Sequence, residues 1–223
     1  MTAPRSWQSE TARLGNAETT DPTAWFERLW ASAKVGDITT PWDRHEPHPV
    51  LASWLEARDA RGPAAGGTAV AVGCGLGADA EHLSRLGYET TAFDISPTAV
   101  AAARDRNPGS SVNYAVGNLL DLAAEWTGAF DLVVEIFTVQ AVRRSVRDGL
   151  TAGVRSLVAP GGTLLAVQAV AERAGDDGPP WPLTRTEIEA FGQDGLSATS
   201  IEVLRDVPAP GGLGVWRAEF RRA

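Results

Sequence analysis

The sequence has little cysteine and no long apolar run. Its 223 residues include one cysteine, Cys74, which excludes an internal disulfide and a cysteine-based zinc site. No apolar stretch reaches the roughly 18–20 residues that a membrane-spanning helix needs. Residues 1–21 are polar and lack the apolar core of a signal peptide. These absences predict a cytoplasmic protein without a membrane partner.

Positive charge is also scarce. Twenty Lys and Arg residues stand against 28 Asp and Glu residues, which gives a net charge of −8. Nucleic acids are bound through clustered basic side chains, so this balance argues against a nucleic-acid partner. Hydrophobic residues make up 43% of the chain, enough for the core of one domain. We expect a small molecule as partner, and the composition leaves a monomer and a homodimer both open.

The first 61 residues differ in pattern from the rest. Residues 1–21 have no lasting hydrophobic period and are expected to form a flexible tail. Residues 22–61 contain two amphipathic helices around a proline-rich loop, the first with Asp21 as its N-cap. We expect this segment to form a helical cap within a single domain that spans residues 22–223.

Strands and helices alternate through most of the remaining chain. The apolar runs predict five strands, at 68–72, 89–93, 112–116, 130–137 and 163–170. Alternation of this kind is typical of an α/β fold whose parallel sheet is covered on both faces. Two later runs, 200–207 and 215–220, flank Pro210-Gly211-Gly212 and predict an antiparallel hairpin at the C-terminus.

A glycine-rich loop follows the first of these strands. The segment Val72-Gly73-Cys74-Gly75-Leu76-Gly77 lies between the strand and a helix, where glycines permit a sharp turn and close approach of a ligand. Asp94 ends the second strand, 19 residues after Gly75. A carboxylate there can bind both hydroxyls of a ribose, although it can also cap the helix that begins at Ser96-Pro97.

Several motifs in order resemble one enzyme class. The glycine loop, Phe93-Asp94-Ile95-Ser96, Phe130-Asp131-Leu132-Val133 and Pro160-Gly161-Gly162 resemble the motifs of class I S-adenosylmethionine-dependent methyltransferases. The resemblance implies a three-layer, Rossmann-like sandwich with a seven-stranded, mostly parallel sheet and S-adenosyl-L-methionine as cofactor. Thr40-Pro41-Trp42-Asp43 is similar to the thiopurine methyltransferase-like enzymes, which implies a thiol or an aromatic heterocycle as methyl acceptor.

The resemblance also assigns cofactor-binding residues. Those implied to contact the cofactor are Trp42, Gly73, Cys74, Gly75, Gly77, Asp79, Asp94, Ile95, Asn118, Leu119 and Glu135. Asp94 would hold the ribose, and Asn118-Leu119 would lie at the adenine edge. Ala71 stands where the class usually has an acid. Asp79 either replaces that acid or simply complements the helix dipole.

The acceptor side is less sharply marked, because methyl transfer needs positioning more than a fixed catalytic motif. The candidates for a catalytic role are Glu135, Asp43 and His45, since carboxylates and imidazoles accept protons. An alternative is that His45 and His48 are simply solvated residues of a loop. Too few other metal-ligating side chains lie near them in the sequence to predict a metal site. The candidates for substrate binding are Trp30, Trp42, Gln140, Arg144 and Trp181.

Two other functions fit the same motifs. An NAD-dependent oxidoreductase uses a similar glycine loop and acid. A Tyr-x-x-x-Lys pair is missing, however, and the C-terminal hairpin favours the methyltransferase. A module that binds the cofactor without turnover is suggested by Ala71 and by Asn118, which stands where an Asp is usual. We expect methyl transfer to a small molecule by in-line displacement.

Overall fold

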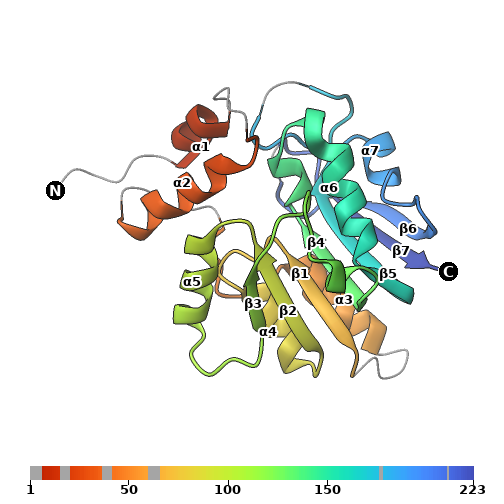
Figure 1. Cartoon of the computed structure of the whole chain (residues 1–223). Coiled ribbons are helices and arrows are strands. Elements are labelled where there is room, and N and C mark those ends of the chain that lie inside the picture. The colour runs from red at the N-terminus through yellow and green to blue at the C-terminus, as the bar shows by residue number, and fades with distance from the viewer. Residues whose placement is uncertain (1–6, 16–20, 37–41, 60–65, 176–177, 210) are drawn as a thin grey trace.

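A seven-stranded sheet forms the centre of the protein (Figure 1). The computed structural model describes residues 7–15, 21–36, 42–59, 66–175, 178–209 and 211–223. The strands follow the order β3-β2-β1-β4-β5-β7-β6. Their bounds are β1 Thr68–Val72, β2 Glu89–Asp94, β3 Asn113–Val116, β4 Phe130–Ile136, β5 Val158–Ala169, β6 Leu196–Leu204 and β7 Val215–Arg222.

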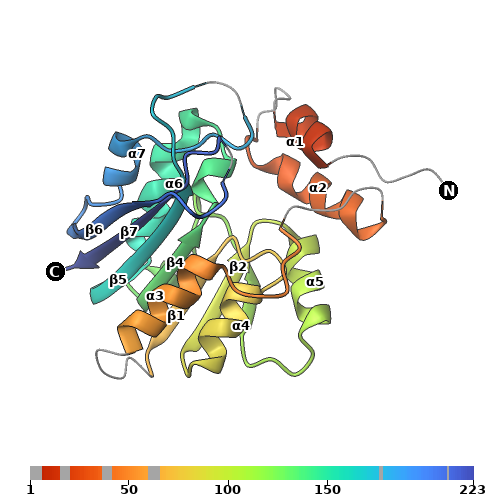
Figure 2. The same cartoon turned by 180° about the vertical axis from the view of Figure 1, so that it is seen from behind.

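Helices cover both faces of this sheet. The helices are α1 Trp7–Gly15, α2 Ala24–Lys34, α3 Pro49–Asp59, α4 Ala78–Arg85, α5 Pro97–Arg106, α6 Arg144–Ser156 and α7 Arg185–Glu189, with short 3-10 turns at Ala124–Trp126 and Val139–Ala141. Figure 1 shows α6 in front of the sheet, and Figure 2 shows α3 and α4 on the opposite face. The predicted three-layer α/β fold is confirmed.

The C-terminal hairpin has a more specific arrangement than the sequence predicted. β7 pairs antiparallel with both β5 and β6, so β7 lies between them and is the one reversed strand. β6 therefore forms the edge. Pro160-Gly161-Gly162, predicted as a turn before the fifth strand, lies inside β5, where the register with β4 shifts. Gly161 at φ 73° permits this irregularity.

The register of the central strands decides which side chains reach their ends. Val72 is paired with Phe93 on one side and with Glu135 on the other. Paired residues of neighbouring strands point to the same face. Glu135 is therefore level with Phe93 and one residue short of Asp94. Strand β4 is apolar on both faces and largely buried, as expected for a central strand covered by helices.

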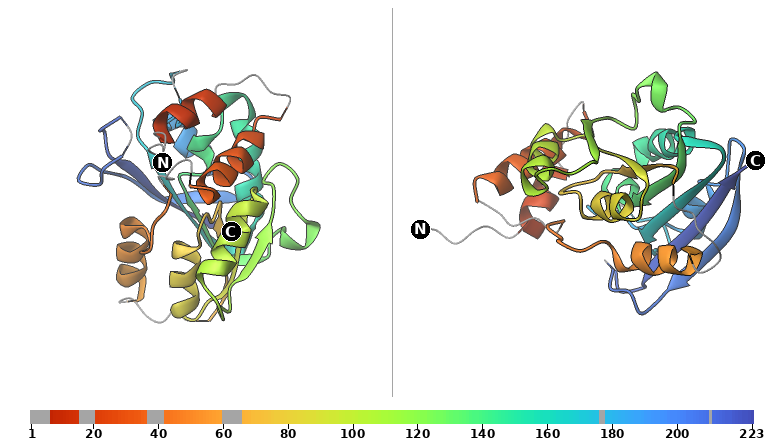
Figure 3. Two further views of the ribbon diagram at one scale, coloured as in Figure 1. Left: turned by 90° about the vertical axis from the view of Figure 1, so that its left-hand side faces the viewer. Right: turned by 90° about the horizontal axis from the view of Figure 1, so that it is seen from below.

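Helices α1 and α2 lie beyond the carboxyl ends of the strands (Figure 3). The predicted tail contains one of them, because Leu14 of α1 is buried against Trp25 and Leu29 of α2. Asp21 precedes α2, whose N-cap is Thr23. The carboxylate of Asp21 accepts hydrogen bonds from the Thr23 N–H at 2.8 Å and the Thr23 hydroxyl at 2.7 Å.

Helix α2 is fixed to α5 by one carboxylate. Glu27 accepts hydrogen bonds from the Ser96 hydroxyl at 2.5 Å, the Thr98 hydroxyl at 2.6 Å and the Thr98 N–H at 3.2 Å. Negative charge at the N-terminus of α5 is favoured by the helix dipole. This contact holds α2 above the residues that follow Asp94. Among the described residues no helix is long and apolar enough to cross a membrane.

Candidate active site

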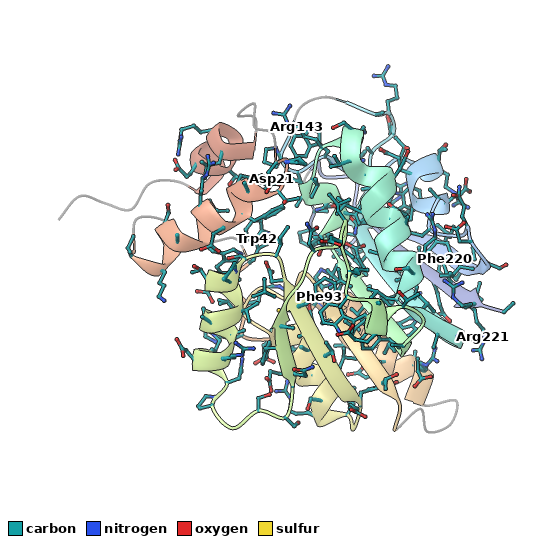
Figure 4. The ribbon with its side chains drawn as sticks, viewed as in Figure 1. Asp21, Trp42, Phe93, Arg143, Phe220 and Arg221 are labelled. Carbon is teal, nitrogen blue, oxygen red and sulfur yellow. The ribbon has the colours of Figure 1, made fainter. Side chains whose placement is uncertain are left out.

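A cavity of about 400 Å³ lies between the carboxyl ends of β1, β2 and β4 and the N-terminal helices. This size falls within the roughly 300–1,000 Å³ of small-molecule sites. In open α/β sheets ligands bind at these strand ends. Figure 4 shows Trp42 between α2 and the sheet, with Phe93 below it. The cavity therefore has a floor of strand ends and glycine loop and a wall of aromatic side chains.

The glycine loop forms the floor. Gly73, Gly75 and Gly77 have φ of 61°, 50° and 89°, a backbone conformation that disfavours any residue with a Cβ. Gly73 and Gly75 line the cavity, together with Cys74. A Cβ on Gly77 would collide with the Tyr114 hydroxyl, so this glycine serves the packing of α4 and does not line the cavity.

Asp94 lies at the edge of the loop and is 7% exposed. Its carboxylate accepts the Gly75 N–H at 3.0 Å through one oxygen and the Ser96 N–H at 3.0 Å through the other. Burial raises the pKa of this carboxyl, while these backbone hydrogen bonds oppose the rise. A carboxylate offers about four acceptor positions. Each oxygen of Asp94 therefore has room for one further donor from the cavity.

Asp79 joins the glycine loop to the segment before α3. It accepts hydrogen bonds from Arg44 Nη2 at 2.9 Å and from the His48 N–H at 2.6 Å. The other terminal nitrogen of Arg44, Nη1, is buried and has no hydrogen-bond partner among the described residues. A buried guanidinium nitrogen without a partner is costly. The cavity, which Arg44 lines, therefore offers one site for an anionic group.

Aromatic side chains form the upper wall. Trp42 lies 5.9 Å from Trp30 and 6.2 Å from Phe26 between ring centroids, and all three line the cavity. Trp25 stacks on Phe26 at 4.0 Å and belongs to the core of α1 and α2. Such rings bind flat molecules and cations through their faces.

Opposite them, Phe137 follows β4 with a left-handed backbone. Its φ of 61° is uncommon for a bulky residue and costs roughly 1–2 kcal/mol. The Phe137 N–H donates to the Val167 carbonyl at 3.0 Å, which holds this conformation. The ring meets the imidazole of His48 edge-on at 5.2 Å between centroids. Both rings line the cavity.

The structure brings ten of the predicted site residues to the cavity. They are Trp30, Trp42, Gly73, Cys74, Gly75, Asp79, Asp94, Ile95, Asn118 and Leu119. Asn118 accepts the Leu120 N–H at 2.9 Å through its side-chain oxygen, and this leaves its amide nitrogen as a donor. Burial raises the pKa of the Cys74 thiol, which disfavours a role as a thiolate nucleophile.

Glu135 does not line the cavity, contrary to the predicted role. It is fully buried and accepts the N–H groups of Thr138 at 2.8 Å and Val139 at 2.9 Å, and it also accepts the side-chain amide of Gln168. Burial raises the pKa of this carboxyl to about 7 against these hydrogen bonds. Its oxygens are used by these three donors, whereas Phe93, at the same level of the sheet, lines the cavity.

Five more candidates lie elsewhere for identifiable reasons. Asp43 forms an ion pair with Arg106 at 2.8 Å, and His45 is exposed. Gln140 is buried and accepts the Ala169 N–H at 2.6 Å. Arg144 binds Glu187 at 2.9 Å and the Pro182 carbonyl at 2.8 Å. Trp181 is buried, and its carbonyl accepts from Arg147 at 2.7 Å.

Sequence reasoning missed part of the site. The residues that line the cavity without having been chosen include Arg44, His48, Phe137, Thr138, Val207 and Pro208. His48 carried a usable signal, because it directly precedes the helix that begins at Pro49 and a side-chain acceptor is favoured there. Val207 and Pro208 follow β6, so only tertiary structure brings them near. Within the described chain, no three His, Cys, Asp or Glu residues gather as metal ligands.

Comparison with known proteins gives the family context. Residues 69–162 match the family model described as a methyltransferase domain. The ubiquinone biosynthesis O-methyltransferase of Xanthomonas axonopodis pv. citri is 39% identical over 132 residues, covering 55% of this chain and 53% of the relative. The homologue from Xanthomonas campestris pv. campestris is 39% identical over 124 residues. The chain thus spans about half the length of the curated relatives it matches.

Solved structures show the same fold. The N-methyltransferase NodS from Bradyrhizobium japonicum, in complex with S-adenosyl-L-homocysteine, is similar with a TM-score of 0.62 and 18% identity, covering 97% of this chain and 98% of that one. A protein studied for disulfide-to-thioacetal conversion in echinomycin biosynthesis has a TM-score of 0.68 and 23% identity, covering 88% and 93%. Residues 69–162 therefore match a methyltransferase domain, and the chain has the fold of these solved structures.

Proposed function

We propose that this protein transfers a methyl group from S-adenosylmethionine to a small-molecule acceptor. The observation that carries the proposal is the carboxylate of Asp94. It is held by two backbone N–H groups at the rim of a glycine loop and keeps acceptor positions open toward the cavity. A ribose diol offers the two donors that such a carboxylate binds.

The residues present fit the whole cofactor. Asp94 would bind the ribose, and Ile95, Asn118 and Leu119 would surround the adenine. The buried, unpartnered Nη1 of Arg44 would bind the carboxylate of the methionyl part. Asp79, which already holds Arg44, would lie near the amino group and offset the missing acid at Ala71. When bound, the cofactor supplies an activated sulfonium methyl group.

The protein would contribute position and shielding to the reaction. The rings of Trp30 and Trp42 would cover the acceptor or the sulfonium and exclude water. An aromatic wall suits a flat molecule such as a heterocycle, a phenol or an aryl thiol. The curated relatives named above are O-methyltransferases. The Trp42-Asp43 element of this chain resembles the thiopurine methyltransferase-like enzymes. Thr40 and Pro41, the first two residues of that element, lie outside the described residues. Cytoplasmic location stays a prediction.

The first experiment is calorimetric titration with S-adenosylhomocysteine, with NADH as the control ligand. We expect micromolar binding of the first and none of the second. A matched pair, Asp94→Asn and Asp131→Asn, locates the site, because Asp131 is exposed and binds Thr68 outside the cavity. Binding of NADH alone would contradict the proposal. Formation of a methylated product in an acceptor screen would then exclude the alternative that the protein binds the cofactor without catalysing methyl transfer.

A further inference from the structure

His48 is the one histidine among the described residues that lines the cavity, and it is 6% exposed. Its ring nitrogen Nδ1 accepts the N–H of Val50 at 3.2 Å, in the first turn of α3. Its own backbone N–H donates to Asp79 at 2.6 Å. The ring is further held by the edge-on contact with Phe137. Position and orientation of this imidazole are therefore fixed by three separate contacts.

The hydrogen bond to Val50 decides where the imidazole carries its proton. A nitrogen that accepts an N–H must be unprotonated, so the proton of the neutral ring is on Nε2. Burial, followed by the positive charge of Arg44, lowers the pKa of His48 to about 4, while Asp79 opposes this shift. Nε2 has no hydrogen-bond partner among the described residues. His48 thus presents an N–H donor to the cavity and no acceptor.

The other ionisable groups that line the cavity are also poorly suited to take a proton. Asp79 is bound to Arg44 and to the His48 backbone, and the remaining acceptor positions of Asp94 would be taken by the ribose of the cofactor. The thiol of Cys74 has a pKa raised by burial. Thus no lining side chain in the described part of the chain is placed as a general base for the acceptor.

We propose that His48 binds the methyl acceptor in its ionised form, donating from Nε2–H to an anionic oxygen or sulfur of a phenol-like or thiol-like acceptor. This inference rests on the proposed function. The N–H of a neutral imidazole donates a stronger hydrogen bond to an anionic atom than to a neutral one, which favours an anion over a neutral amine. His48 is in this account a residue that binds and positions the acceptor, while deprotonation occurs to solvent before transfer.

The reaction balances without a protein base. The acceptor loses its proton to water on binding, and its lone pair then forms the bond to the methyl carbon. The carbon–sulfur bond of the sulfonium breaks with its electrons remaining on sulfur, which becomes a neutral thioether. An acceptor whose nucleophile is acidic enough to ionise near neutral pH is therefore required, and an aliphatic alcohol is excluded as a substrate.

The test uses the full chain saturated with S-adenosylhomocysteine and the probe 4-nitrophenol, whose anion absorbs visible light. At pH 6 the free probe is mostly neutral, so growth of the phenolate absorption on adding protein reports binding as the anion. Nitrobenzene serves as the matched probe without an ionisable oxygen. We expect 4-nitrophenol to bind as phenolate at pH 6 and, at a pH where the free probe is fully ionised, to bind roughly tenfold more tightly than nitrobenzene, as a hydrogen bond to a charged group predicts.

Two variants separate the donor from the helix contact. The variant His48→Asn retains an acceptor at the position of Nδ1 but loses the Nε2–H donor. We expect it to bind the phenolate roughly tenfold more weakly. The variant His48→Gln retains an N–H donor close to the position of Nε2, so its affinity for the phenolate should fall by less than about threefold. His45→Asn, a change at an exposed histidine outside the cavity, should leave the affinity unchanged.

The proton position has its own measurement. Nuclear magnetic resonance of histidine-labelled protein should show His48 protonated on Nε2 and unprotonated on Nδ1 at pH 7, with and without the probe. An imidazolium in the complex would show that His48 acts as a base, and probe binding in the neutral form would overturn the proposed acceptor class. Failure to bind S-adenosylhomocysteine would instead contradict the proposed function, which the first titration step reveals before any probe is added.

Discussion

The ends of β2 and β4 are alike in sequence and different in the folded protein. Each strand has an acidic residue at or next to its last position, Asp94 in β2 and Glu135 in β4, and each acid is buried. Asp94 lies at the last position of its strand and faces the cavity. Glu135 is one residue deeper, level with Phe93, and its carboxylate binds the turn that follows β4.

An acid near the end of a strand is thus not by itself a site residue. The level in the sheet does not decide the role either, because Val72 and Phe93, at the level of Glu135, both line the cavity. Asp94 has two oxygens partly free for a ligand, whereas the oxygens of Glu135 are used by protein donors. The first acid should therefore control ligand binding, and the second should control stability.

The largest effect is expected from Glu135→Ala. Three donors, on Thr138, Val139 and Gln168, lose their acceptor, and each unsatisfied buried group costs roughly 1–3 kcal/mol. We expect the free energy of unfolding to fall by about 3–5 kcal/mol, measured by urea denaturation. Glu135→Gln preserves an acceptor oxygen and should lose much less. Equal stability of Glu135→Ala and wild type would show that this carboxylate is not structural.

The carboxyl of Glu135 should also make the free energy of unfolding depend on pH. Burial raises the folded-state pKa of Glu135 to about 7 from 4.5. Between these values the folded state binds more protons at Glu135 than the unfolded state does, so the stability that this carboxyl contributes is complete below pH 4.5 and is lost as the pH rises through 7. We expect a decrease of about 2–3 kcal/mol between acidic and mildly alkaline pH. Glu135→Gln should remove most of this slope in urea denaturation across the same pH range.

Asp94→Ala should act on ligand binding and not on stability. We expect the affinity for S-adenosylhomocysteine to fall by about 1–3 kcal/mol, because the ribose hydroxyls lose their acceptor. Calorimetry on Asp94→Ala and Glu135→Gln side by side makes the distinction. If Glu135→Gln weakened the ligand as much as Asp94→Ala, the two strand ends would share one function after all.

The smallest effect is expected at Arg44. Arg44→Met should weaken S-adenosylhomocysteine by about 1 kcal/mol, because the side chain is 38% exposed and its charge is partly screened. Methylthioadenosine, which lacks the amino-acid part, should bind the variant and the wild type alike. A loss of equal size for both ligands would place Arg44 away from the methionyl carboxylate.

Much of the fold was predictable from the sequence. The strands β1 to β4 and the helix capped by Ser96-Pro97 follow from local patterns of apolar residues, glycine and proline. The place of β7 between β5 and β6 depends on tertiary pairing, and the sequence predicted only an antiparallel hairpin there. Helix α1 was missed because Leu14 is stabilised by Trp25 and Leu29, residues distant from it in sequence.

The site was predictable to a different degree in its two halves. The cofactor half consists of a glycine loop and strand ends, where backbone geometry restricts the sequence, so Gly73, Gly75 and Asp94 stood out. The acceptor half is built from side chains of separate segments. His45 and His48 are three residues apart in one loop, and only the helix beginning at Pro49 and the ring of Phe137 distinguish the buried one.

The carboxylate of Glu27 has a consequence for how this protein can change. It attaches α2 to α5 through Ser96 and Thr98, and Trp30 of α2 also packs against Ala99 of α5. Phe26, a half-buried ring that lines the cavity, takes no part in these contacts. Phe26 can therefore be varied while the helix keeps its anchor, so it is a natural place to diversify in directed evolution of new acceptor ranges.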